Sequence, residues 1–155
     1  MIRPATSADV LAIHGSIVEL AIYEREPEAV VATVEQIQEN LFGKDPVAHC
    51  HVAEVDGQVV GIAIWFLNYS TWLGKAGLYL EDLFVKPEFR SRGLGLQLMK
   101  TLAQICVERG YERFQWWVLD WNEPSINFYK SIGAEAMDQW TVYRLSGDAL
   151  KNFAD

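Results

Sequence analysis

Residues 81–95 read EDLFVKPEFRSRGLG and contain a pattern that is typical of anion binding. Within this stretch Arg90, Gly93 and Gly95 form the pattern R-x-x-G-x-G, placed between an apolar run and a long amphipathic run. Each glycine lets the backbone turn tightly and approach a ligand without a Cβ atom in the way. The helix that follows offers unpaired N–H groups and the positive end of its dipole. With Arg90 and Arg92 as charged donors, the loop suits a pyrophosphate.

Two common nucleotide-binding motifs do not fit this loop. A dinucleotide-binding fingerprint needs a glycine three residues after Gly95, and that position is Leu98. A P-loop needs Gly-Lys-Ser or Gly-Lys-Thr after four spacer residues, and the sequence has neither. The alternative that stays open is a glycine-rich helix start that binds nothing.

Glu81 and Asp82 are a second candidate for chemistry, because they interrupt a strand that is otherwise apolar. A carboxylate in such a place needs a reason, since burying a charge without a partner costs free energy. Successive residues of a strand face opposite sides, so we expect the two side chains to serve different points. The alternative is a structural salt bridge to a nearby Arg or Lys.

The elements that position these residues follow from hydrophobic periodicity and from turn residues. Asp56-Gly57 between two apolar runs indicates a tight hairpin, and Gly110 is typical of a helix end. The order of elements predicts a mixed α/β domain without a linker, so residues 1–155 are expected to form one domain. The expected strands are 2–4, 50–55, 58–65, 76–85, 113–119 and 139–145, and the expected helices are 8–23, 33–41, 93–109 and 124–131.

Composition limits the class of protein. Of 155 residues, half are hydrophobic and 22% are charged, which supports a compact core. The formal net charge of −8 argues against a nucleic-acid partner and suits a cationic small molecule, although solubility alone also explains it. Two cysteines, no signal-peptide pattern and no run long enough to cross a bilayer predict a cytoplasmic protein without a membrane partner.

Four segments of the sequence resemble one known family. They are IRPAT and ELAIYE near the start, YLEDLFV before the glycine-rich loop, and WNEPSINFYKSIGA at residues 121–134. Together with R-x-x-G-x-G they resemble the GNAT acetyltransferase superfamily. Within it they are most similar to the diamine acetyltransferases, the spermidine/spermine and thialysine group. The resemblance runs from Ile2 to at least Leu145, and the WNEPSINFYK segment is its most specific part.

The resemblance implies a fold and a co-substrate. The fold is a mixed, mostly antiparallel central sheet flanked by helices, with a splayed strand pair that forms the acetyl-CoA site. No metal is implied. The backbone of residues 83–85 holds the pantetheine arm, the glycine-rich loop holds the pyrophosphate, and the segment after Trp121 lines the cofactor. The implied cofactor-binding residues are Leu83, Phe84, Val85, Arg90, Ser91, Arg92, Gly93, Leu94, Gly95, Leu96, Asn122, Glu123, Pro124, Ser125 and Tyr129.

The resemblance also implies the catalytic residues. Glu81 is the base that takes a proton from the substrate amine through water, and Tyr129 is the acid that protonates the departing thiolate. Without the family context, Tyr129 on a short helix is an ordinary packing residue. The implied substrate-binding residues are Tyr23, Glu24, Glu81, Asp82, Gln115, Trp116 and Trp117.

The consecutive Trp116 and Trp117 depart from the smaller groups of the family. They create either a bulky wall or a cation–π surface in the acceptor region. His49 and His51 share a strand face but lack a third ligand, so no metal site is expected.

The predicted function is acetyl-CoA-dependent N-acetyl transfer to a primary amine of a small cationic substrate: a diamine, a polyamine or a lysine-like amino acid. The resemblance also implies a homodimer. Two alternatives stay open. One is acetylation of a protein lysine or N-terminus, and the other is a non-catalytic acyl-CoA sensor.

Overall fold

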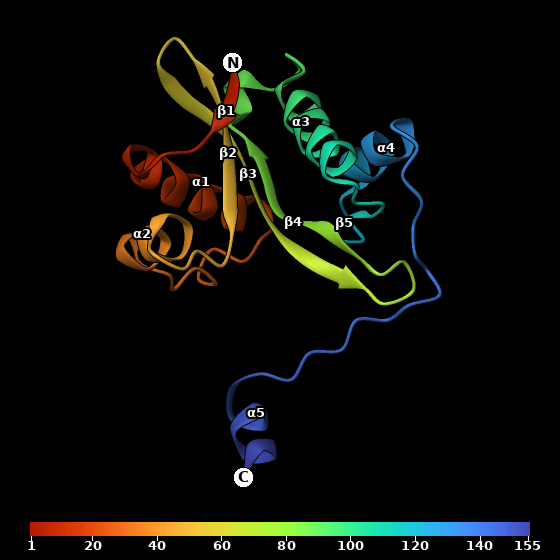
Figure 1. The fold of residues 1–155 in the computed structure, drawn as a ribbon. Coiled ribbons are helices and arrows are strands. Elements are labelled where there is room, and N and C mark those ends of the chain that lie inside the picture. Colours follow the sequence, from red (N-terminus) through yellow and green to blue (C-terminus); the bar gives the residue numbers. More distant parts are fainter. The chain divides into compact units, whose positions relative to one another are not determined.

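A computed structural model describes residues 1–155, which divide into two compact units, Met1–Trp117 and Val118–Asp155. The first unit holds a five-stranded sheet with the strand order β1-β2-β3-β4-β5 (Figure 1). Its elements are β1 (Ile2–Pro4), α1 (Val10–Tyr23), α2 (Val34–Phe42), β2 (His49–Val55), β3 (Gln58–Ser70), β4 (Lys75–Val85), α3 (Leu94–Arg109) and β5 (Phe114–Trp116). The second unit holds α4 (Glu123–Ser131) and α5 (Gly147–Ala154).

Strands β1 to β4 pair antiparallel with their neighbours, and β5 pairs parallel with β4. This confirms the predicted mixed, mostly antiparallel sheet. The β2–β3 hairpin turns at Asp56 and Gly57, which both have positive φ, 49° and 76°. Such a turn matches the right-handed twist of the flanking strands, and Asp-Gly is a favoured pair for it. None of the helices combines the length and the apolar character that crossing a bilayer requires.

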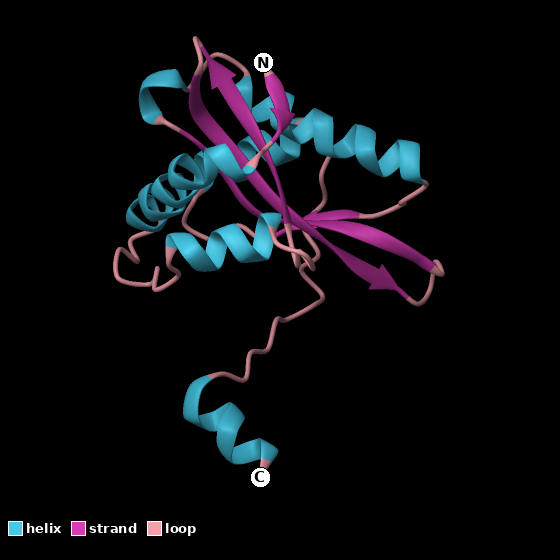
Figure 2. Ribbon diagram, turned by 60° about the vertical axis from the view of Figure 1, so that its left-hand side comes forward, coloured by secondary structure: helices cyan, strands magenta, loops and turns pink.

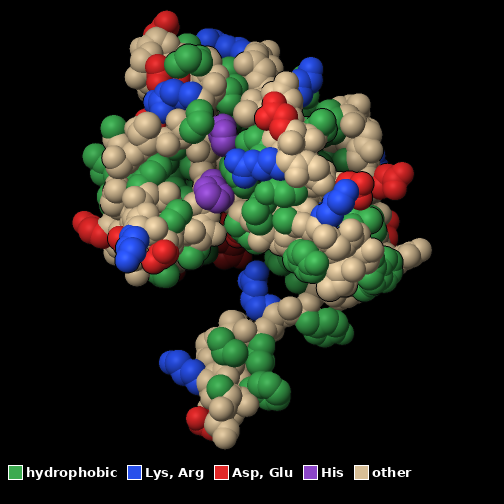
Figure 3. All heavy atoms as spheres, in the orientation of Figure 1, with side chains coloured by type: hydrophobic (Ala, Val, Ile, Leu, Met, Phe, Trp, Pro, Cys, Tyr) green, Lys and Arg blue, Asp and Glu red, His purple; other side chains and the backbone are tan.

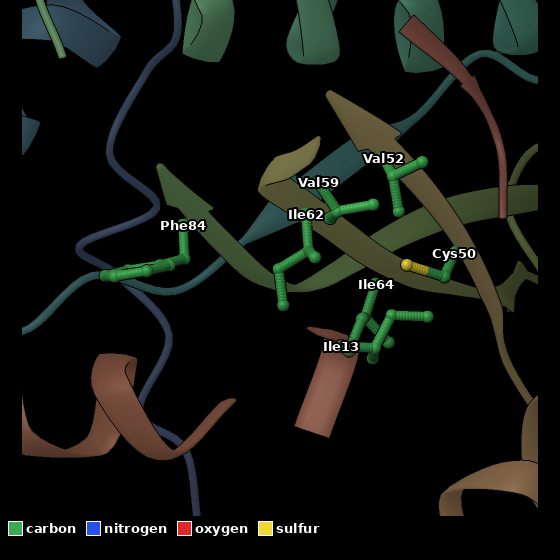
Figure 4. Close-up of a cluster of buried hydrophobic side chains, with 7 residues drawn as sticks. All are labelled: Ile13, Cys50, Val52, Val59, Ile62, Ile64 and Phe84. Atoms are coloured by element: carbon green, nitrogen blue, oxygen red, sulfur yellow. The ribbon is translucent and has the colours of Figure 1, made fainter. Parts of the chain in front are cut away.

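Helices cover both faces of this sheet, α1 and α2 one face and α3 the other (Figure 2). We call these the α1 face and the α3 face. On the α1 face, Ile13 belongs to one buried cluster with strand residues that include Ile62, Ile64 and Phe84 (Figure 4). On the α3 face, Leu98 and Leu102 are fully buried. The two faces therefore have separate hydrophobic layers, and strand residues alternate between them.

Arg3 on β1 fixes the beginning of α1 against the sheet. Its guanidinium lies 2.8 Å from Asp9, just before α1, and 2.7 Å from Glu54 on β2. The hydrogen bonds from Arg3 hold the pKa of Asp9 below its usual value. Because Ile13 is also buried, the helix is held along the sheet, and its last residue, Tyr23, is carried toward β4.

The predicted strand at residues 139–145 is wrong, because these residues belong to no helix or strand. Their apolar side chains are exposed, and Trp140 and Tyr143 keep 67% and 93% of their accessible surface. An extended segment becomes a strand only by pairing, and the second unit contains no strand to pair with. The short α5 after this segment was not predicted, and its hydrophobic side chains are also exposed (Figure 3).

Candidate active site

The candidate acids lie at a β-bulge in β4. Ile64 on β3 pairs with Asp82, but the next residue, Trp65, pairs with Leu80, so Glu81 is an extra residue without a partner. Ile64 belongs to the α1-face cluster and Asp82 shares its side of the sheet. A bulge breaks the alternation of side chains and can turn one of them to a new side, which is why bulges are common beside active sites.

The bulge brings Glu81 and Asp82 together, so the expectation that they serve different points is wrong. Burial, followed by the charges of Glu81 and Glu24, raises the pKa of Asp82 to about 6. Burial and the charge of Glu81 raise the pKa of Glu24, the C-cap residue that follows α1. The three carboxyl groups therefore lie within electrostatic reach of one another on the α1 face. The salt bridges of Arg3 with Asp9 and Glu54 and of Lys75 with Glu112 involve none of the three.

The residues of β4 that precede the bulge extend this site toward the β3–β4 turn. Tyr79 pairs with Phe66 on one side and with Gln115 on the other. Its ring centroid is 4.9 Å from that of Phe66 and 5.8 Å from that of Trp117, which meets it edge-on. Burial and the charges of the two acids raise the pKa of Tyr79 to about 12.

The two consecutive tryptophans lie on different faces. Trp116 pairs with Leu80, and its ring packs 5.0 Å from that of Phe114, on the α3 face. Trp117 contacts Tyr79 on the α1 face and stays 58% exposed. Of the pair, Trp117 is the one that lies on the same face as the acids.

Phe66, Tyr79, Asn68 and Arg113 were not among the predicted site residues. The predicted strand ended at residue 65, whereas β3 continues to Ser70, so their common face could not be recognised. The run of alternating residues after Trp65, with Phe66 and Asn68 on one side, is the signal that could have extended the strand.

The β4–β5 pair separates where the cofactor arm was predicted. β5 pairs only with residues 78–80 of β4 and ends at Trp116, whereas β4 continues to Val85. Leu83 and Val85 are paired with β3 on one edge, while their other edge has no β5 partner. Backbone groups on that edge are therefore able to hydrogen-bond an extended ligand.

The glycine-rich loop has the backbone geometry that close approach of an anion needs. Ser91 and Gly93 have positive φ, 63° and 75°, and a Cβ atom added at Gly93 would meet no atom within 4 Å. α3 begins at Leu94 without a side-chain cap, so its first N–H groups point into this open space. The loop residues therefore fit a pyrophosphate.

Arg90 connects the glycine-rich loop to the α1 face of the first unit. Its Nε donates to the carbonyl oxygen of Val85 at 2.8 Å. Its guanidinium carbon lies 5.2 Å from the ring centroid of Tyr23 and 5.5 Å from that of Phe84. Arg90 therefore contacts both the end of α1 and the end of β4.

The second predicted cofactor segment forms α4 in the second unit. Asn122 is buried, caps the helix and accepts a hydrogen bond from the Ser125 N–H at 3.4 Å. Pro124 in the first turn suits a helix start, where its missing N–H is not needed. Tyr129 lies in the last turns of α4, half-buried, with its ring 5.6 Å from that of Phe128.

His49 and His51 form a packed cluster with Trp65 on the α3 face. The indole Nε1 of Trp65 donates to Nδ1 of His51 at 3.1 Å, and the His49 ring lies 4.5 Å from the Trp65 ring. Burial lowers the pKa of both histidines. The structure contains no group of three or more His, Cys, Asp or Glu side chains that could hold a metal ion.

Comparison with known proteins decides the family. Residues 16–134 match the family model described as Acetyltransferase (GNAT) family. The chain belongs to the GNAT acetyltransferase family. It is 36% identical to the thialysine N-epsilon-acetyltransferase of Bos taurus over 165 residues, which cover 99% of this chain and 96% of that protein. It is 30% identical to an L-ornithine N5-acetyltransferase of Arabidopsis thaliana, covering 97% and 86% of the two chains.

A solved structure shares the fold of this chain. An integron cassette protein from the mobile metagenome of V. cholerae superposes with a TM-score of 0.84 at 28% identity, covering 99% of this chain and 96% of the other. The chain is therefore a GNAT-type N-acetyltransferase in fold and in family.

Replacing Gly93 of this GNAT protein by Val is expected to abolish stabilisation by coenzyme A. A ligand that binds only the folded state at about 100 times its Kd stabilises it by about 2.7 kcal/mol. The valine side chain fills the open space at the loop and strains a residue of positive φ. The measurement is the Tm with and without coenzyme A.

Gly74→Val is the matched control, because Gly74 also has a positive φ, 64°, and open surroundings, but lies in the β3–β4 turn. It should lower the Tm through the same backbone strain and keep the coenzyme A shift. A Gly93→Val protein that keeps the shift would contradict the pyrophosphate assignment.

Proposed function

We propose that the chain is an acetyl-CoA-dependent N-acetyltransferase that acts on a primary amine of a small cationic acceptor. The observation that carries this proposal is the β4 bulge, which gathers Glu81, Asp82 and Glu24 on one face. The bulge lies at the point where β4 leaves β5, next to the edge proposed for the cofactor arm. Acids at that point suit an incoming ammonium group, which must lose a proton before it can attack.

Each residue has one role in this proposal. Acetyl-CoA supplies the acetyl group as a thioester, so the C–S bond breaks as the C–N bond forms. Glu81 takes the proton from the amine through water. Asp82 and Glu24 keep the site negative and attract the ammonium group. Tyr129 gives a proton to the departing thiolate, a role that rests on the family resemblance.

We propose the roles of the cofactor-binding residues segment by segment. The backbone of residues 83–85 holds the pantetheine arm, and the loop from Arg90 to Leu96 holds the pyrophosphate. Asn122, which caps α4, is proposed to bind the pantetheine with the help of the segment after it. Because the family model spans both compact units, we propose that they work as one domain.

The class of acceptor is proposed from the relatives and from the site. The relatives named above act on thialysine and on L-ornithine, and both names describe amino acids with a side-chain amine. The net charge of −8 also suits a cationic acceptor. Acidic and basic side chains are interspersed on the face shown in Figure 3, without a broad basic surface for nucleic acid. A homodimer and a cytoplasmic location stay predictions.

A thiol-release assay with acetyl-CoA and a panel of amines tests the proposal. We expect release of coenzyme A with at least one small primary amine of the panel, and a gain of one acetyl group on that amine by mass spectrometry. The panel contains L-lysine, thialysine, L-ornithine, putrescine, spermidine and a lysine-containing peptide. Binding of acetyl-CoA without turnover of any amine would identify a sensor, and turnover of the peptide alone would identify a protein acetyltransferase.

A further inference from the structure

We infer that the acceptor is an amino acid with a side-chain amine, because the α1 face carries a subsite for its carboxylate, formed by Arg113 and Gln115. The reacting amine lies at the acids of the bulge and the carboxylate at the other end of the same face. This inference rests on the proposed function and names its substrate class.

The strand register places both ends of the site on one face. Counting back from the bulge along β4, Tyr79 and Gly77 lie on the same side. Asn68 pairs with Gly77 and Gln115 pairs with Tyr79. Arg113, two residues before Gln115, shares its side, and its carbonyl oxygen accepts from the Leu78 N–H at 2.9 Å.

Gly77 makes room for the polar end of this face. A Cβ atom at Gly77 would lie 2.6 Å from the Asn68 Oδ1 and 3.0 Å from the Arg113 carbonyl oxygen. Without a side chain there, Asn68 and Arg113 reach across β4 toward each other. The Arg113 Nη2 donates to Asn68 Oδ1 at 3.3 Å and to the Tyr69 carbonyl oxygen at 3.0 Å.

The polar end offers donors rather than acceptors. Both bonds of Arg113 use Nη2, so its Nη1 is left to donate to another acceptor. The Asn68 Nδ2 donates to the Gln115 Oε1 at 3.3 Å, which leaves the N–H groups of Gln115 for another acceptor. A guanidinium and an amide N–H group together suit a carboxylate, because hydrogen bonds between charged groups are the stronger ones.

The rings of Phe66, Tyr79 and Trp117 lie between the two ends. They provide an apolar surface for the methylene chain of the acceptor. Glu81 and Gly77 are four residues apart, roughly 13 Å along the strand. A short acceptor with an amine at one end and a carboxylate at the other, together with a hydrogen bond at each end, suits a span of this order.

The order of charges along the face decides between the candidate acceptors. A diamine or polyamine laid along it would bring its second ammonium group toward the Arg113 guanidinium. An amino acid with a side-chain amine instead places its ammonium group at the acids and its carboxylate at the cation, so both ends are complementary.

The test compares each amino acid with the diamine made by removing its carboxyl group. The pairs are L-lysine with cadaverine and L-ornithine with putrescine, and the quantity is kcat/KM for coenzyme A release. We expect the wild-type protein to prefer the amino acid of at least one pair by about 10- to 100-fold, the range for one hydrogen bond to a charged group. Equal use of both members, or preference for the diamine, would overturn the inference.

Arg113→Met removes the guanidinium and keeps the apolar stem. It should raise the KM for the amino acid about 10- to 100-fold and leave kcat/KM for the diamine almost unchanged. Lys75→Met is the matched control, because it removes an exposed cation of the same hairpin and should change neither value by more than about twofold. An equal loss on both substrates in Arg113→Met would overturn the inference.

A second variant keeps the test sharp if Arg113→Met does not fold. Gln115→Glu replaces the free amide donors by a carboxylate. It should therefore lower kcat/KM for the amino acid and raise kcat/KM for the diamine. No change in selectivity from Gln115→Glu would overturn the subsite. A wild-type protein that acetylates none of these amines while binding acetyl-CoA contradicts the proposed function itself, which separates the two failures.

Discussion

Tyr129→Phe is expected to lower turnover by roughly a hundred- to ten-thousand-fold, the range for a lost general acid. Phenylalanine keeps the ring and its contact with Phe128, so the fold of α4 should survive. A free tyrosine has a pKa of about 10, so the hydroxyl is protonated near neutral pH and able to donate. The bound thioester does not need this donor, whereas the departing thiolate does. The loss should therefore appear in kcat, with affinity for acetyl-CoA almost unchanged.

The control for Tyr129→Phe is Phe128→Leu on the same turn of α4, which changes packing without removing a hydroxyl group. Its kcat should stay within a few-fold of the wild type. The loss in Tyr129→Phe becomes smaller if water enters and protonates the thiolate. A Tyr129→Phe protein that folds, binds acetyl-CoA and turns over at the wild-type rate would remove Tyr129 from the mechanism.

Glu81→Gln is expected to reduce turnover by a comparable factor, roughly a hundred- to ten-thousand-fold near neutral pH. Glutamine keeps the shape of the side chain but cannot take a proton. The loss should become smaller as the pH rises, because more of the amine is then already deprotonated. The measurement is kcat against pH, with the Kd of acetyl-CoA as a check that the cofactor site is intact. Wild-type rates near neutral pH would make Glu81 a structural residue.

Asp82→Asn is the comparison variant for Glu81→Gln, because the bulge places both acids on the same face. Burial raises the pKa of Asp82 from 3.8 to about 6 in the folded protein, so the folded state binds this proton more tightly than the unfolded chain does. The free energy of unfolding therefore falls as the pH rises from about 4 through 6. Asp82→Asn should remove this fall and raise the Tm near neutral pH, whereas Glu81→Gln should leave most of it, because burial is the larger cause of the raised pKa of Asp82.

The sequence alone determined the family, the geometry of the glycine-rich loop and most of the helices and strands. R-x-x-G-x-G and WNEPSINFYK are local patterns. Their structure is predictable from sequence because a helix cap, a tight turn or a glycine of positive φ depends only on neighbouring residues. The positive φ of Gly93 and the Asn122 cap of α4 are of this kind. The Asp-Gly hairpin was predictable for the same reason.

The tertiary structure decided the features that depend on pairing between strands. Residues 139–145 have the composition of a strand, but a strand needs a partner edge, and their own unit has none. Glu81 and Asp82 meet because β3 and β4 shift register by one residue, which no pattern within β4 records. Arg113 reaches Asn68, 45 positions earlier, only because β3, β4 and β5 lie side by side. Side-chain types and local turns can be read from the sequence. The face on which distant residues meet is set by hydrogen bonds between strands.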